Sequence, residues 1–278
     1  MGALVRPAAF TALAQIAMVS AEPERLVQFL AEGLGFEPKG SAPVPPSECA
    51  LLGVASVTRQ ALVLGQQRVA IDRFPEVRPY PNHIAANDPR FQHFAIVTSD
   101  IAAAWARAKA AGARPISHDG PVQLPLASGG AIAIKFRDPD GHPLELLQFS
   151  GAARADWRGS GNLGIDHSAI VVANCDRSLA FYNEHGLAVV HRSLNHGVEQ
   201  QQLDNLTDAK DSAEVKVIAM QSSERGPKLE LLGYAAISGG STAKLVSDTS
   251  ATRLIWHSSQ NELLQDPDGH FHQLSLEQ

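Results

Sequence analysis

Cysteine is scarce in this sequence of 278 residues, which holds only Cys49 and Cys175. Two cysteines exclude a disulfide framework and a cysteine-rich zinc site, and they favour a reducing compartment. The sequence also lacks an uninterrupted apolar run of about 18 residues, the length that a membrane-spanning helix needs. We therefore expect a cytoplasmic protein without a membrane segment.

An excess of positive charge is missing as well. Lys and Arg number 23 against 29 Asp and Glu, which gives a formal net charge of -6. Such a chain has no general attraction for phosphate backbones, so we expect no nucleic-acid partner. The sequence contains no phosphate-binding loop, dinucleotide motif or Ser-His-Asp arrangement. With 44% hydrophobic and 19% charged residues, the composition is that of a globular protein.

The N-terminal segment allows two interpretations. Arg6, the apolar stretch 8–19 and the following Ser20-Ala21 imitate an export signal with its cleavage site. In the other interpretation, residues 14–19 are the first strand of a repeat and residues 23–32 are its helix. We prefer the second, because the same pattern recurs along the chain.

Internal repeats organise the sequence. The segments 91–97 and 165–171 each place a histidine at the head of an apolar, β-branched run. An amphipathic helical stretch follows each of them, at 101–111 and 176–184, and ends at a glycine. Several short alternating runs come next, which are typical of strands. The repeating unit is therefore strand, helix and three strands.

A fourth copy is located from its end, where Asp266-Pro-Asp-Gly-His270 repeats Asp138-Pro-Asp-Gly-His142. Its first strand is expected at 251–256, which leaves no room for a helix before the turn. We predict an α+β fold in which tandem βαβββ repeats form curved mixed sheets around a cleft. Segment 1–150 would hold a degenerate first unit and a second unit, and segment 160–278 a third unit and a truncated fourth.

Two histidine–glutamate pairs stand out in the middle units. His93 heads the first strand of the second unit, and Glu145 lies in its last strand; His167 and Glu230 hold the same places in the third unit. Both glutamates lie in the sequence Leu-Glu-Leu-Leu. A buried carboxylate is costly unless it is paired or bound to a metal. Taken singly, each glutamate could face solvent and each histidine could be a hydrogen-bonded structural residue, but the repetition favours ligands.

These units, the two pairs and the Asp-Pro-Asp-Gly-His turn resemble the vicinal oxygen chelate superfamily, which includes glyoxalase I, extradiol dioxygenases and metal-free bleomycin-resistance proteins. In that superfamily, two units form a cleft whose first and last strands point ligands at one divalent metal. The resemblance implies His93, Glu145, His167 and Glu230 as metal ligands, with Glu145 and Glu230 also catalytic. The metal would be Zn, Ni, Co, Mn or Fe(II), which suit imidazole and carboxylate ligands.

The outer units depart from this pattern. The first has Gln15 at the histidine position and no acid in residues 66–71; the fourth has Thr252 at the histidine position and Gln273 where Glu145 aligns. If units two and three pair, one cleft holds all four ligands and the other holds none. We prefer this arrangement. The alternative is a site formed by Gln15, His93 and Glu145.

Three functions are consistent with these observations. The first is a metal-dependent enzyme of glyoxalase type, a lyase or isomerase in which a Lewis acid stabilises an enediolate-like charge and a glutamate moves a proton. The second is an Fe(II) extradiol dioxygenase, for which His191, His196 and Tyr234 are acid–base candidates. The third is a metal-free small-molecule binding or resistance protein. Each implies a small-molecule substrate or ligand, and we expect a monomer or a homodimer.

Other polar features have simpler explanations. His142 and His270 lie in the two Asp-Pro turns and are expected to face solvent or to brace the loop. His257 and His272 are expected to point away from the ligand face of their strands. The polar run 192–201 is predicted to be an exposed turn, and the alternative is a rim that contacts substrate.

Overall fold

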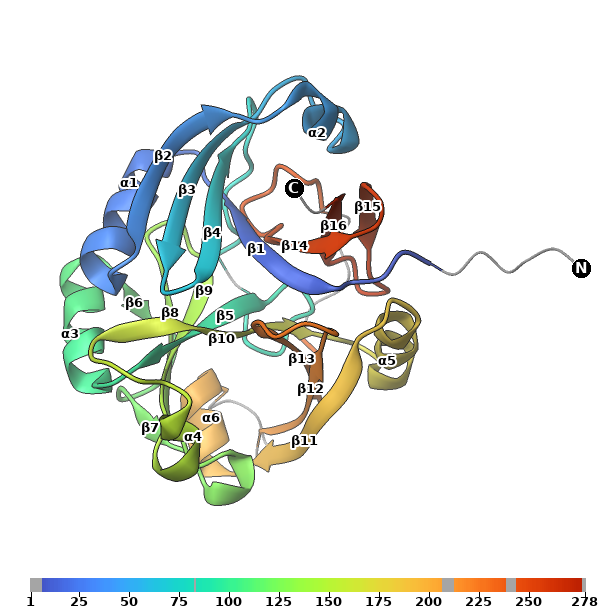
Figure 1. The fold of residues 1–278 in the computed structure, drawn as a ribbon. Coiled ribbons are helices and arrows are strands. Elements are labelled where there is room, and N and C mark those ends of the chain that lie inside the picture. The colour runs from blue at the N-terminus through green and yellow to red at the C-terminus, as the bar shows by residue number, and fades with distance from the viewer. Residues whose placement is uncertain (1–6, 83, 207–212, 239–243, 277–278) are drawn as a thin grey trace, which may run out of the picture.

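The chain forms two curved mixed sheets that pack against each other, with helices at their flanks and over their open faces (Figure 1). The computed structural model describes residues 7–82, 84–206, 213–238 and 244–276. The predicted α+β fold is confirmed. Arg6 of the predicted export signal lies outside the described residues, whereas residues 12–19 of the same segment form a strand.

The first and fourth units build one sheet of seven strands. Its order is β15-β16-β14-β1-β4-β3-β2, and β1 pairs antiparallel with β14 at the junction of the two units. β14 runs into β15 without a helix, as the sequence predicts. The strands are β1 Ala12–Val19, β2 Glu37–Pro43, β3 Thr58–Leu64, β4 Gln67–Arg73, β14 Arg253–Ser258, β15 Glu262–Gln265 and β16 Phe271–Leu276.

The second and third units build the other sheet, which has nine strands. Its order is β11-β12-β13-β10-β5-β9-β8-β6, with β7 also paired to β8. Each sheet therefore takes strands from both the 1–150 and the 160–278 segments. The strands are β5 Gln92–Thr98, β6 Arg114–Pro115, β7 Val122–Gln123, β8 Ile132–Arg137, β9 Pro143–Gln148, β10 Asn162–Val171, β11 Ala188–His196, β12 Glu214–Gln221 and β13 Lys228–Tyr234.

The two ten-residue helices, α3 and α5, begin at side-chain caps. Asp100 accepts a hydrogen bond from the Ala103 N–H and Asn174 from the Arg177 N–H, which satisfies donors that the first helical turn leaves free. The predicted exposed turn at 192–201 is wrong, because β11 continues to His196 and a helix follows. The helices are α1 Pro23–Gln28, α2 Pro46–Leu51, α3 Ile101–Ala110, α4 Gly151–Ala155, α5 Cys175–Glu184 and α6 Val198–Asp204, with a π-helical turn η1 at Phe29–Gly33 and a 3₁₀ turn η2 at Leu126–Ser128.

Strand alternation separates the core from the concave face of the nine-stranded sheet. Phe94 and Ile96 of β5 and Leu144 and Leu146 of β9 belong to the main hydrophobic core, which also includes residues of the other sheet. The residues between them therefore point to the opposite, concave face. Glu145 is one of these, and it is 5% exposed. The solvent-facing interpretation of this carboxylate is thus wrong.

The two Asp-Pro turns connect the units. Asp138 Oδ1 accepts hydrogen bonds from the backbone N–H groups of residues 140–142, and Asp138 Oδ2 lies 2.6 Å from His142 Nδ1. His142 Nε2 lies 3.0 Å from the Val19 carbonyl at the end of β1. His270 Nε2 makes the equivalent contact and lies 3.0 Å from the Val171 carbonyl of β10. Both histidines are buried, so they brace the turns and do not face solvent.

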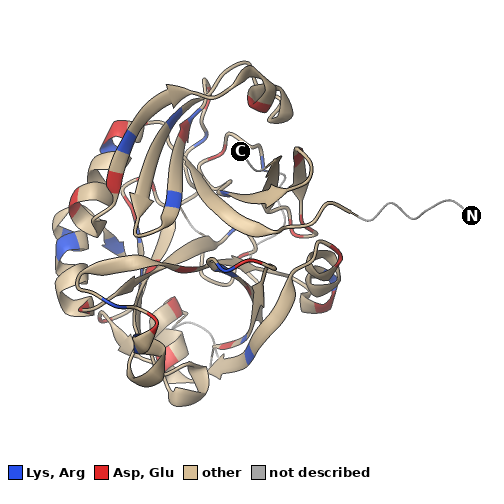
Figure 2. Cartoon of the chain, in the orientation of Figure 1, with Lys and Arg blue, Asp and Glu red and all other residues tan. Residues whose placement is uncertain are grey.

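Acidic and basic positions are interspersed over both sheets and the helices in Figure 2. Of the helices that the structure describes, none is long and apolar enough to cross a membrane.

Candidate metal centre

Four adjacent strands carry the predicted ligands on one face of the nine-stranded sheet. Their order in the sheet is β13-β10-β5-β9. In the central antiparallel pair, His93 lies opposite Ala169, and His167 lies opposite Ala95. The flanking parallel pairs place Glu145 beside Ala95 and Glu230 beside Ala169. The four functional positions are therefore related by a local twofold arrangement of the second and third units.

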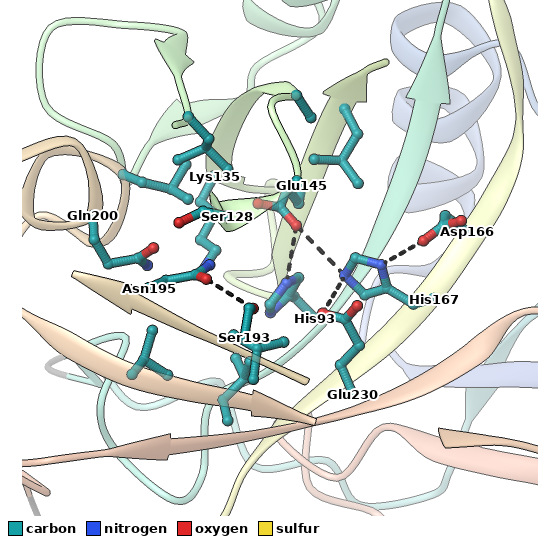
Figure 3. Close-up of a pocket in the computed structure, with 18 of the residues that line it drawn as sticks. His93, Ser128, Lys135, Glu145, Asp166, His167, Ser193, Asn195, Gln200 and Glu230 are labelled. Atoms are coloured by element: carbon teal, nitrogen blue, oxygen red, sulfur yellow. Dashed lines mark hydrogen bonds and ion pairs between the residues drawn. The ribbon is translucent and has the colours of Figure 1, made fainter. Parts of the chain in front are cut away.

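The side chains converge in the cleft (Figure 3). Glu145 Oε2 lies 3.3 Å from His93 Nε2 and 3.6 Å from His167 Nε2. His167 Nε2 also lies 3.5 Å from Glu230 Oε2. One group of His93, Glu145 and His167 and a second of Asp166, His167 and Glu230 each have ligand atoms within 4.8 Å of one another. The structure thus joins His93, Glu145, His167 and Glu230 through shared contacts of Glu145 and His167.

Burial and charge give the two histidines opposite protonation preferences. Burial lowers the pKa of His93 to about 4, although Glu145 opposes this shift. Burial also disfavours the charged form of His167, but Glu230, Asp166 and Glu145 together raise its pKa to about 10. Burial acts to raise the pKa of Glu145, yet the two imidazoles and the charge of Lys135 hold that pKa well below its usual range. The cluster therefore keeps its carboxylate ionised.

A β-bulge aims two consecutive side chains at this site. The register between β10 and β5 shifts between Ile165 and His167, which leaves Asp166 as the extra residue. Asp166 Oδ2 lies 2.9 Å from His167 Nδ1, and the Lys228 ammonium lies 3.0 Å from both oxygens of Asp166. A carboxylate on the outer nitrogen of a histidine fixes the ring and its tautomer. Asp166 therefore orients His167 with Nε2 toward the cleft.

A buried ion pair lies beside Glu145. Lys135 of β8 is the cross-strand partner of Glu145, and its ammonium lies 2.6 Å from Asp204 Oδ1 on α6. Asp204 Oδ2 accepts hydrogen bonds from the Tyr234 hydroxyl at 2.8 Å and from the Gln200 amide at 2.6 Å. The second unit supplies Lys135 and the third supplies the other residues. This network closes one side of the cleft.

The cleft encloses a cavity of about 200 Å³. His191 and Tyr234, two of the predicted acid–base candidates, belong to its walls; His196 is not among the lining residues. Asp166, Lys135 and Asp204 were missed by the sequence analysis. Only the position of Asp166 next to His167 was a signal, and alternation would have placed it on the opposite face.

The donor set fits a divalent metal. Ligands about 2.1 Å from one ion lie about 3.0–3.4 Å apart in octahedral or tetrahedral geometry. The contacts of 3.3, 3.5 and 3.6 Å within the cluster are close to these separations. Imidazole with carboxylate suits Zn, Mn, Co, Ni or Fe(II).

The corresponding face of the seven-stranded sheet holds a different arrangement. In the pairing of β1 with β14, Arg253 lies opposite Ala17. In the pairing of β5 with β10, His93 lies opposite Ala169 in the same way. Arg253 therefore occupies the histidine position, and the predicted Thr252 does not. β4 extends to Arg73 and contributes the buried acid Asp72, which residues 66–71 did not include. Arg253 and Arg59 both bind Asp72, at 2.5 and 2.7 Å.

Helix α2 also covers this second face. Glu48 of α2 lies 2.9 Å from both Arg59 and Gln273, and Arg253 donates to Gln273 at 3.1 Å. Of the positions that correspond to the candidate ligands, Arg253 is thus in an ion pair, Gln273 is hydrogen-bonded to it, and Ala70 stands where Glu145 lies in the other sheet. Gln15 lies in β1 of this sheet, so the structure does not bring it together with His93 and Glu145.

Comparison with known proteins agrees with this architecture. Residues 12–146 match the model of the Glyoxalase/Bleomycin resistance protein/Dioxygenase superfamily. The resemblance found in the sequence is thereby confirmed. No curated protein matches the chain.

Solved structures extend the likeness over almost the whole chain. Glyoxalase I from Zea mays has 16% identity and a TM-score of 0.62, and the match covers 95% of this chain and 92% of that one. A protein described as a putative dioxygenase from Bacillus subtilis has 12% identity and a TM-score of 0.59, with 96% and 86% covered. At these identities the comparisons show the fold.

Proposed function

We propose that this protein is a metal-dependent enzyme in which His93, Glu145, His167 and Glu230 bind one divalent ion. The observation that carries the proposal is the set of contacts of 3.3–3.6 Å among these side chains, of which all but Glu230 are buried. When bound, the ion would act as a Lewis acid on two neighbouring oxygens of a small substrate. The reaction class is a proton-transfer isomerisation or lyase reaction, as in glyoxalases.

The two glutamates differ in how firmly they are held. Glu145 contacts both imidazoles and its side chain is 7% exposed. Glu230 contacts His167 alone at 3.5 Å, and its side chain is 18% exposed. A general base must move between the substrate and its resting partner, which requires a carboxylate with few constraints. We therefore assign Glu145 to holding the site and Glu230 to proton transfer.

In this scheme Glu230 removes a proton from the carbon that bears the hydroxyl oxygen and returns it to the neighbouring carbonyl carbon, while the hydroxyl proton passes to the former carbonyl oxygen. Product and substrate are isomers, so no oxidant or other reactant is consumed. Lys135 and Asp166 remain in place, because each is held by an ion pair. Their role is to maintain the charge of Glu145 and the orientation of His167.

Metal analysis and turnover test this proposal together. Protein purified without chelators should contain about one divalent ion per chain and should isomerise the hemithioacetal of methylglyoxal with 2-mercaptoethanol. Glu145→Gln should lose most of the metal. Glu230→Gln should retain more metal than Glu145→Gln but should lose turnover. It should also fail to exchange the carbon-bound proton of the substrate with deuterated solvent. A protein that binds no added metal would instead support the metal-free binding function.

An extradiol dioxygenase is the second candidate. His93, His167 and Glu145 form a set of two histidines and one carboxylate, which is the ligand type of non-haem Fe(II) oxygenases. His191 and Tyr234 are acid–base groups in the same cleft. Oxygen consumption by the Fe(II)-loaded protein with catechol, without isomerase turnover of the hemithioacetal, would favour this function over the first.

A further inference from the structure

The charges that line the cavity are already paired. Lys135 and Lys228 are the only lysines or arginines among the described lining residues. Lys135 lies 2.6 Å from Asp204, and Lys228 lies 3.0 Å from Asp166. A cation that is bound to a carboxylate at this distance offers little net attraction to a second anion. The described part of the cavity wall therefore holds no free cation for an anionic group of a substrate.

One buried group of the described cavity wall that has no partner is a hydrogen-bond acceptor. Gln200 is 4% exposed, lines the cavity and points its amide toward the interior (Figure 3). Its Nε2 donates to Asp204, and its Oε1 has no hydrogen-bond partner among the described residues. Because a carboxylate accepts from Nε2, the amide orientation is fixed by chemistry. An unpaired amide oxygen this close to the cavity disfavours an anion there.

The remaining wall is mostly apolar and the space is small. Leu124, Leu147, Leu203, Val217 and Leu232 are among the apolar residues that line the cavity. The volume of about 200 Å³ compares with the roughly 150 Å³ of an engineered apolar cavity that binds benzene. The cavity thus accommodates a molecule about as large as one substituted ring.

We infer that this cleft selects a compact molecule whose two neighbouring oxygens face the metal centre and whose remaining body is uncharged, and that Asp204 determines this selection by neutralising Lys135. The inference rests on the proposed function, because the metal centre holds the two oxygens. Asp204 comes from α6 of the third unit, whereas Lys135 comes from β8 of the second. The pairing therefore depends on the junction of the two units. Removing the carboxylate would expose a buried ammonium beside the substrate.

Two ligands that differ by one distant charge test this inference. 4-Methylcatechol and 3,4-dihydroxybenzoate share the same neighbouring oxygens, and only the second carries a carboxylate, on the far side of the ring. Their dissociation constants for the Zn²⁺-loaded full-length protein are measured by isothermal titration calorimetry. We expect 4-methylcatechol to bind at least about 10-fold more tightly, which is a difference of about 1.4 kcal/mol. Equal or tighter binding of 3,4-dihydroxybenzoate would overturn the inference.

Variants then assign the selection to Asp204. Asp204→Asn should reduce the preference at least about 10-fold or reverse it, because the Lys135 charge is released. The double variant Lys135→Gln/Asp204→Asn removes both charges and should restore the preference. Asp156→Asn on the exposed α4 cap removes a carboxylate elsewhere and should change nothing. An unchanged preference in Asp204→Asn contradicts the role of Asp204. If that variant does not fold, the wild-type comparison still decides whether the cleft prefers the uncharged ligand.

The two proposals fail in different ways. If neither ligand binds more tightly to the Zn²⁺-loaded protein than to the metal-free protein, the proposed function fails, and this inference fails with it. If both ligands bind in a metal-dependent manner but without preference, only the inference about charge fails.

Discussion

His167 Nε2 lies 3.6 Å from Glu145 Oε2, although the two residues come from different repeat units. The antiparallel pairing of β5 with β10 makes this contact, because it joins the first strands of units two and three at the centre of one sheet. Each unit alone supplies one histidine and one glutamate. The candidate metal centre is therefore a property of the junction between two units.

Asp166 should control metal affinity through His167. Replacing it with Asn keeps the size of the side chain but removes the charge that orients the ring. Removal of such an outer partner typically weakens metal binding about 10–100-fold. Competition with a chromophoric chelator measures the dissociation constant for Zn²⁺ in wild type and Asp166→Asn. The exposed Asp156→Asn serves as the control, and equal affinities of all three proteins would show that Asp166 has no such role.

Asp72 should be important for stability and unimportant for the metal. It is completely buried and is the shared partner of Arg59 and Arg253. Asp72→Asn leaves the buried guanidinium of Arg253 without its counter-charge, which costs about 3–5 kcal/mol of the free energy of unfolding. Urea denaturation measures this loss. Glu37→Gln, in which the exposed pair with Lys39 is removed, should change stability by less than about 0.5 kcal/mol.

A small loss in Asp72→Asn would mean that the network adds little to the fold. Loss of metal binding from the folded variant would contradict the separation of the two sheets into a structural and a functional one.

His142 should make stability depend on pH. Both of its ring nitrogens face acceptors, the Asp138 carboxylate and the Val19 carbonyl, so the ring must be doubly protonated to satisfy them. Burial opposes the charge, but Asp138 raises the pKa of His142. The stabilisation is therefore complete below the unfolded-state pKa of about 6.5 and is lost as pH rises through the higher folded-state pKa.

The comparison with His142→Gln isolates this contribution. Urea midpoints of both proteins are measured from pH 6 to pH 9 in the same buffers, so that other titrating groups cancel. The advantage of the wild type should shrink as pH rises. An advantage that stays constant, or grows, would mean that His142 is neutral in the folded protein.

The sequence predicted the fold because its signals are local and repeated. His93 and His167 head matching strands, and the same Leu-Glu-Leu-Leu run holds Glu145 and Glu230. Alternation put the leucines in the core and the glutamates on the other face, where the structure has them. Whether these residues bind a metal stays a prediction.

Local sequence patterns could not indicate the residues that support the candidate site and the turns. The partner of Lys135 is Asp204, 69 residues later in a helix that the polar sequence did not indicate. Asp166 faces the site only because of a bulge, which pairing and not local propensity produces. His142 and His270 seemed exposed because Asp-Pro turns usually are, whereas here the ends of β1 and β10 cover them.

The central claim is that His93, Glu145, His167 and Glu230 hold one metal ion. Crystals grown with Zn²⁺ and measured on both sides of the zinc absorption edge test it most directly. The account predicts one strong anomalous peak per chain in the cleft, about 2.0–2.3 Å from a nitrogen of each histidine and an oxygen of each glutamate. Peaks elsewhere on the chain with none among these four side chains, at saturating Zn²⁺, would contradict it.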